Sequence, residues 1–139
     1  MAEKKNGENE IGRFLQEWKF GGELPMKKWF QLLFDTVRVM DNVELQFVSR
    51  PGVSYSMRPK HGNQKERDLF AMIDVIDDAE RWLSVCFYGD MISDPNGRGE
   101  VIPGGLAGSD GYCFDMFEDD EDLAHYLVDR LLEAAAAVE

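Results

Sequence analysis

Cysteine and histidine are scarce in this sequence, which contains two residues of each. The two cysteines, Cys86 and Cys113, are too few for a disulfide framework and lack the Cys-x-x-Cys spacing typical of zinc sites and thiol redox enzymes. We therefore expect both thiols to be free and buried. Because His61 and His125 are the only imidazoles, a serine-hydrolase triad is also a poor explanation of the chain.

Long apolar runs are missing as well. No stretch approaches the roughly 18 residues that a membrane helix needs, and residues 1–10 lack the apolar core of a secretory signal. We therefore expect a cytoplasmic protein without membrane contact. We interpret residues 1–10 as a disordered tail and residues 11–139 as a single domain, since domains cluster at about 100–150 residues.

Positive charge is scarce in the second half of the chain. Residues 1–70 carry 12 basic and 10 acidic side chains, whereas residues 71–139 carry 3 basic and 17 acidic ones. A field of this sign repels phosphate backbones, so nucleic acid is a poor candidate for a partner unless the basic stretch from Arg58 to Arg67 forms a patch of its own. We interpret that stretch as a solvated loop.

The sequence does contain clear changes of hydrophobic period. A spacing of three to four residues predicts helices, and alternation or a short continuous apolar run predicts strands. The predicted helices are 11–18, 25–40 and the segment after the acidic run 118–122, and the predicted strands are 43–47, 53–57, 69–76, 82–88 and 112–117. This order predicts an α+β fold of two layers, in which N-terminal and C-terminal helices pack on an antiparallel sheet of about five strands.

Four features lie between Pro25 and Tyr88: the helix that ends at Met40, the strand pair around Arg50-Pro51-Gly52-Val53, the Leu69-Phe70-Ala71 entry into the third strand, and Trp82-Leu83-Ser84-Val85. In this order they resemble small uncharacterised bacterial domains of the YjbR-like kind. The resemblance implies a bacterial origin and a shared fold. It implies no catalytic residue, because that family supplies none and the segment 90–114 does not match it.

The segment from Gly89 to Gly111 has seven glycines and two prolines in 23 residues. Apolar residues are interspersed in it, which favours a long ordered loop over a flexible linker. We expect its apolar side chains to contact a partner; they are Met91, Ile92, Val101, Ile102 and Leu106.

Two aspartates are candidates for acid–base chemistry. Asp74 interrupts an apolar run, where a carboxylate is costly to bury unless Arg58 or Arg81 pairs with it. If Asp74 lines a pocket with Asp90, it could act as the acid or base of a small enzyme. The alternative is that Asp74 lies on the wet face of its strand in an ordinary cross-strand ion pair.

Three residues are candidates for metal binding. Asp94 and Asn96 begin like a calcium loop, but Arg98 and Gly105 stand where oxygen ligands are needed, which favours a plain turn. His125 lies four residues after Glu121 and four before Asp129, an arrangement that can hold a metal and is also common on solvated helix faces. We expect no metal and no cofactor.

These observations favour a noncatalytic binding or protein-interaction module over an enzyme. The alternative is a small enzyme, or a ligand- or metal-binding pocket, beneath the 89–111 loop with Asp74, Asp90 and Asp94 as its polar groups. The expected partner is an unknown protein or a small ligand, and the chain would be a monomer or a homodimer.

Overall fold

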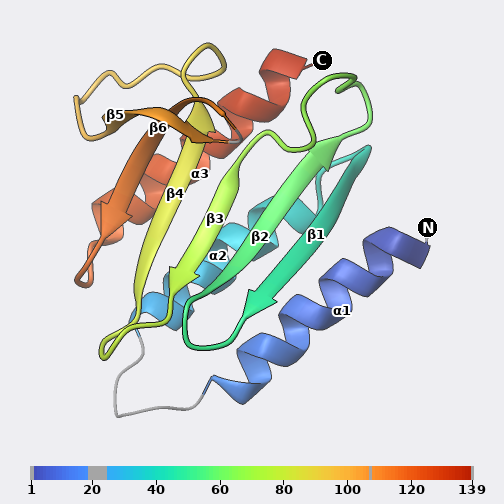
Figure 1. Ribbon diagram of the computed structural model, residues 1–139, viewed down its shortest axis with the longest axis vertical. Coiled ribbons are helices and arrows are strands. Elements are labelled where there is room, and N and C mark those ends of the chain that lie inside the picture. Colours follow the sequence, from blue (N-terminus) through green and yellow to red (C-terminus); the bar gives the residue numbers. More distant parts are fainter. Residues whose placement is uncertain (1, 19–24, 107, 139) are drawn as a thin grey trace.

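The computed structural model describes residues 2–18, 25–106 and 108–138, with side chains from Gly7 onward. Six strands form one antiparallel sheet in the order β1-β2-β3-β4-β6-β5 (Figure 1). In chain order the elements are α1 (Ala2–Glu17), α2 (Pro25–Arg38), β1 (Val43–Arg50), β2 (Ser54–His61), β3 (Met72–Ile76), β4 (Trp82–Tyr88), β5 (Glu100–Leu106), β6 (Ser109–Met116) and α3 (Glu121–Val138). None of the helices in these ranges is long and apolar enough to cross a membrane.

The two layers are a sheet and a pair of helices. Figure 1 shows α2 and α3 together behind the sheet. They pack there because α2 has an apolar stripe, including Trp29, Phe30 and Leu33, that is buried along its whole length. Leu127 and Leu131 form the matching stripe of α3 and are also fully buried. The predicted α+β architecture is confirmed, with six strands in place of about five.

The first four strands form a meander, as their alternating sequence patterns predict. Pro51 and Gly52 make the turn between β1 and β2, and Gly52 has a φ of 82°, which glycine adopts at no steric cost. The β1–β2 register pairs Val43 with His61 and Arg50 with Ser54. This register places the apolar side of β1 against the helices.

The prediction of a loop over residues 89–111 is wrong for the second half of this segment. Residues 89–99 form a loop, but β5 and β6 then make a hairpin that joins the meander through β4. All residues of β5 except Leu106 are exposed, so buried and exposed residues do not alternate along this edge strand. Pro103 and a register shift between Ile102 and Leu106 also interrupt its pattern.

Helix α1 starts at Ala2, so from that residue onward the predicted tail 1–10 is helical in the structure, and residue 1 lies outside the described part. The helix runs alongside β1 at the edge of the sheet (Figure 1). A side chain at Gly7 would overlap the carbonyl oxygen of Leu45, so glycine permits this close approach. The predicted apolar residues Ile11, Leu15 and Trp18 are buried in the core.

Candidate functional site

The two faces of the sheet are covered differently. On β4, Leu83, Val85 and Phe87 point to the helices and are fully buried, and we call this side the helix-covered face. Trp82, Ser84 and Cys86 alternate with them, point to the opposite side and are half-buried. None of the described helices lies over this second side, which we call the open face (Figure 1). Its central side chains are Met72, Asp74, Ile76, Trp82, Ser84, Cys86, Cys113 and Asp115.

Asp74 lies in the middle of the open face, between Ser56 of β2 and Ser84 of β4 in the register. The Ser56 hydroxyl hydrogen-bonds to Asp74, and Arg58 Nε donates to Ser56 Oγ over 2.9 Å. Oδ1 of Asp74 is buried without a hydrogen-bond partner. Burial raises the pKa of Asp74, although Ser56 and the Arg58 charge oppose this shift. Of the two arginines predicted to pair with Asp74, Arg58 is the one whose charge lowers the pKa of this carboxyl group.

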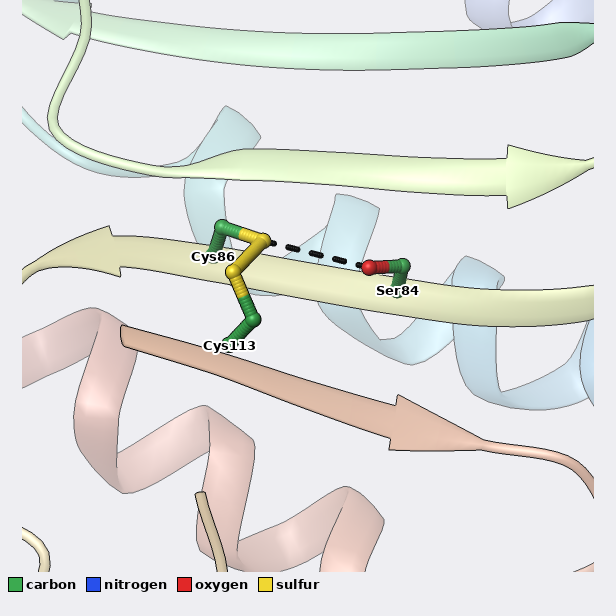
Figure 2. The surroundings of a disulfide bond; sticks show 3 residues. All are labelled: Ser84, Cys86 and Cys113. Carbon is green, nitrogen blue, oxygen red and sulfur yellow. Dashed lines mark hydrogen bonds between the residues drawn. A yellow bond between two sulfur atoms is a disulfide. The ribbon is translucent and has the colours of Figure 1, made fainter. Parts of the chain in front are cut away.

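Cys86 and Cys113 form a disulfide across β4 and β6, so the prediction of free buried thiols is wrong. The two residues face each other directly in the register, with their Cα atoms 4.1 Å apart. Such close antiparallel pairs bring side chains together. Both residues are half-buried on the open face. Figure 2 shows Ser84 on the same side of β4, with its hydroxyl 3.8 Å from Cys86 Sγ.

An aromatic pair occupies one end of the open face. Phe117 follows β6 directly and packs against Trp82 of β4, with ring centroids 4.6 Å apart and ring planes tilted by 32°. Phe117 nevertheless remains 66% exposed. Three exposed acidic residues are close to the pair in the sequence: Asp115 two residues before Phe117, Glu118 directly after it, and Glu80 two residues before Trp82. We call these five residues the aromatic–acidic patch; no sequence motif predicted it.

Asp94 lies away from Asp74, where the 89–99 loop crosses β6 and α3. Its carboxylate accepts hydrogen bonds from the backbone N–H groups of Arg98 and Gly99 and from the hydroxyls of Tyr112 and Tyr126. These four donors hold the pKa of Asp94 well below its usual range, although burial opposes the shift. Asp94 therefore anchors the loop, and its oxygens are already engaged.

Asp90 belongs to a third location, beside the β2–β3 loop. Its carboxylate forms a two-pronged salt bridge with Arg67, at 2.8 and 3.0 Å. The Arg67 guanidinium lowers the pKa of Asp90 and also lies 3.8 Å from the centre of the Tyr88 ring. The three aspartates of the predicted pocket are thus divided among three separate contact groups.

The predicted metal candidates are not brought together either. Asp94 is held by tyrosines, and Asn96 uses its backbone N–H to donate to Tyr126. His125 lies on α3, 3.7 Å from Glu121 and edge-on to the Trp29 ring. Within the described residues no group of three His, Cys, Asp or Glu side chains could hold a metal ion.

The predicted apolar contact residues of the 89–111 segment differ in exposure. Val101 and Ile102 on β5 are 56% and 41% exposed. Leu106 is fully buried over Gly111, where an added Cβ would lie 3.2 Å from the Leu106 Cβ. Met91 is buried and Ile92 is half-buried against the core. Leu106 and Met91 therefore act in the structure as core residues.

A hollow of about 610 Å³ lies between α1 and the β1–β2 hairpin. Arg81 lines this hollow beside two aromatic rings. The Arg81 guanidinium lies 5.0 Å from the centre of the Trp18 ring and 5.1 Å from that of Tyr55. Arg81 also pairs with Asp77 at 3.1 Å, and Asp77 accepts hydrogen bonds from Gly52 N–H and Tyr55 Oη. These contacts connect the β1–β2 turn to the β3–β4 turn. Arg81 therefore forms its ion pair with Asp77 and not with Asp74.

Three of the four arginines and lysines from Arg58 to Arg67 have an acidic neighbour. Lys60 is 3.8 Å from Asp68, Arg67 pairs with Asp90, and Arg58 acts on Asp74. His61 is buried, and its Nδ1 accepts the Asn63 N–H.

No family model matches this chain, and no curated protein or solved structure matches it closely enough to assign a family. The function of the open face is therefore inferred from its own residues.

Proposed function

We propose that this protein is a noncatalytic binding module that holds a basic segment with apolar side chains, from a partner protein, on the aromatic–acidic patch. The observation that carries this proposal is the exposure of Phe117, which keeps 66% of its surface in contact with solvent while it packs against Trp82. A large ring held in place by another ring loses little conformational freedom on binding, which makes it an effective contact residue.

The charge of the patch supports a basic partner. Asp115, Glu118 and Glu80 are exposed and lie within two residues of Phe117 or Trp82 in the sequence. The three arginines of residues 71–139 pair with other carboxylates, namely those of Asp77, Asp120 and Glu133. The patch therefore keeps its negative field, which would speed the approach of a basic segment and hinder an acidic one.

The edges of the sheet support binding on the face rather than by strand addition. Helix α1 lies along β1. At the other edge, β5 carries Pro103, which has no N–H to donate, and the register shift that follows Ile102. A partner strand would find few regularly spaced backbone groups at either edge.

A defined peptide tests this proposal. The probe is a short synthetic peptide that alternates lysine with leucine, and two control peptides carry glutamate in place of lysine or serine in place of leucine. We expect the lysine–leucine peptide to shift the indole N–H resonance of Trp82 far more than those of Trp18 and Trp29, and to bind more weakly as salt is added.

Matched variants then locate the contact. Phe117→Ser should weaken binding about tenfold, as loss of a central aromatic contact does. Leu132→Ser, which removes a 51% exposed side chain from α3, should leave binding unchanged. Equal binding by the glutamate peptide, or equal loss in both variants, would overturn the proposal. A cytoplasmic location and a monomeric or homodimeric state are further parts of the proposal.

A further inference from the structure

The disulfide on the open face has two unequal sulfur atoms. The Ser84 hydroxyl contacts Cys86 Sγ at 3.8 Å (Figure 2). A disulfide sulfur has no proton to give, so Ser84 is the donor in this contact. Along the same row of the sheet, Met72 faces Cys86 from β3, and Arg58 lies one strand further on β2. A hydroxyl donor and a more distant cation are therefore both on the Cys86 side.

The surroundings of Cys113 differ from those of Cys86. Cys113 faces Glu100 of β5 in the register, and Asp115 is the next residue of β6 on the same face. Both carboxylates are exposed. Leu106 blocks the approach to Cys113 from one side. A Cβ added to Gly111 would contact both Leu106 and Cys113 Sγ, so Leu106 lies close to this sulfur. The remaining approach to Cys113 is therefore lined with negative charge.

We propose that the Cys86–Cys113 disulfide is a thiol-exchange site, at which an uncharged or cationic thiol attacks Cys113 and Cys86 is the leaving group. This inference does not depend on peptide binding. The bond is half-buried on a face that no described helix covers, so a small thiol can meet it without unfolding of the core. In the cytoplasm, where we propose that the protein works, disulfides are usually transient, catalytic or redox-sensing.

The exchange takes place in two balanced steps. The incoming thiolate forms a bond to Cys113 Sγ while the Cys86–Cys113 bond breaks, and the electron pair passes to Cys86 Sγ as a thiolate that accepts the Ser84 hydrogen bond. A second thiolate then attacks the sulfur of the first thiol, which releases Cys113 thiolate and a small disulfide. The two protons given up by the thiols protonate Cys86 and Cys113. The protein gains two electrons, and the two thiols are oxidised.

The direction of attack follows from the leaving group. A thiolate leaves faster when a donor or a positive charge lowers its basicity. Ser84 supplies that donor to Cys86. The charge of the thiol matters because Glu100 and Asp115 repel an anion that approaches Cys113.

The first experiment measures reduction of the full oxidised chain by cysteamine and by 3-mercaptopropionate at equal thiolate concentration. Each rate is divided by the rate at which the same thiolate reduces an uncharged small disulfide, because the less basic thiolate is intrinsically the weaker nucleophile. We expect this normalised rate to be several-fold higher for cysteamine, a difference that shrinks with added salt, and each rate to rise in proportion to thiol concentration. Acid quenching followed by mass spectrometry should find the mixed disulfide on Cys113. An adduct on Cys86, or a rate that stops rising with thiol concentration because the chain must first unfold, would overturn the proposal.

The second experiment tests Ser84. Ser84→Ala should slow reduction about threefold or more, and Ser84→Thr, which keeps the hydroxyl, should restore the rate. Ser54→Ala on β2 is the matched control and should react like the wild type. If Ser84→Ala and Ser54→Ala react at the same rate, Ser84 does not assist the leaving group and the assignment of Cys86 fails.

Discussion

On the helix-covered face of β4, Leu83, Val85 and Phe87 are completely buried, whereas on the open face of the same strand Ser84 and Cys86 are half-buried. The first set contributes packing against α2 and α3. The second contributes a disulfide contact and a neighbour for the buried carboxylate of Asp74, and Trp82 of the same face supports an exposed ring. One strand thus carries two kinds of residue, and the side that is not needed for packing is the side available for binding and chemistry.

The sharpest test of this comparison uses two phenylalanines, Phe114 within β6 and Phe117 directly after it. Phe114→Ala should lower the free energy of unfolding by about 4 kcal/mol, because Phe114 is 1% exposed and its loss leaves a cavity. Phe117→Ala should cost less than about 1 kcal/mol, because most of that ring already contacts water. Urea unfolding measures both values. Similar losses would show that Phe117 belongs to the core, which would remove the basis of the proposed patch.

Removal of the disulfide should have the next largest effect. The double variant Cys86→Ser/Cys113→Ser should lose about 3.5 kcal/mol, since the bond closes a loop with a sequence separation of 27 in the unfolded chain. Comparison of urea midpoints for this variant, the oxidised protein and the reduced protein checks the value. If the oxidised protein is no more stable than the variant, the open face contributes nothing covalent to the stability of the fold.

Asp94 should matter less than the disulfide but more than Asp74. Asp94→Asn should cost about 2 kcal/mol at pH 7, because a carboxylate with four donors is replaced by a weaker acceptor. The folded protein lowers the pKa of Asp94 below the ordinary value of an aspartate. Its contribution is therefore fully present above pH 5 and is lost as pH falls below about 4. Urea titrations at several pH values should show the two proteins converging in acid.

Asp74 should show the opposite sign and the smallest effect. Burial raises its pKa, so ionised Asp74 destabilises the fold above that pKa and imposes no such cost when it is protonated in acid. Asp74→Asn should therefore be more stable than the wild type at pH 7, by up to about 1 kcal/mol. The advantage should disappear near pH 3. A loss of stability at pH 7 would mean that the charge of Asp74 is well compensated on the open face.

Several elements could be predicted from sequence because their signals are local. The alternation in 43–47 and 53–57 and the turn at Pro51-Gly52 are features of adjacent residues, and they predicted β1 and β2. The start of α3 was also predicted, and Asp120 caps it by accepting the Leu123 N–H. The resemblance to YjbR-like domains stays a prediction.

The missed features depend on which strands become neighbours. The segments that contain Cys86 and Cys113 were both predicted as strands, but only the β4–β6 register shows that the two residues face each other. The same register brings Phe117 to Trp82. Strand β5 was missed for a different reason, since it lies at the edge and its residues up to Gly105 are all exposed, which leaves no periodic signal.

The order β4-β6-β5 has a consequence for a growing chain. When synthesis has passed Leu106, strands β1 to β4 are complete, but the partner that β4 will have on its outer side, β6, has not yet been made. The backbone of Trp82–Tyr88 then presents an unpaired and largely apolar edge. The nascent protein is most vulnerable to aggregation during this interval, and the arrival of residues 109–116 ends it.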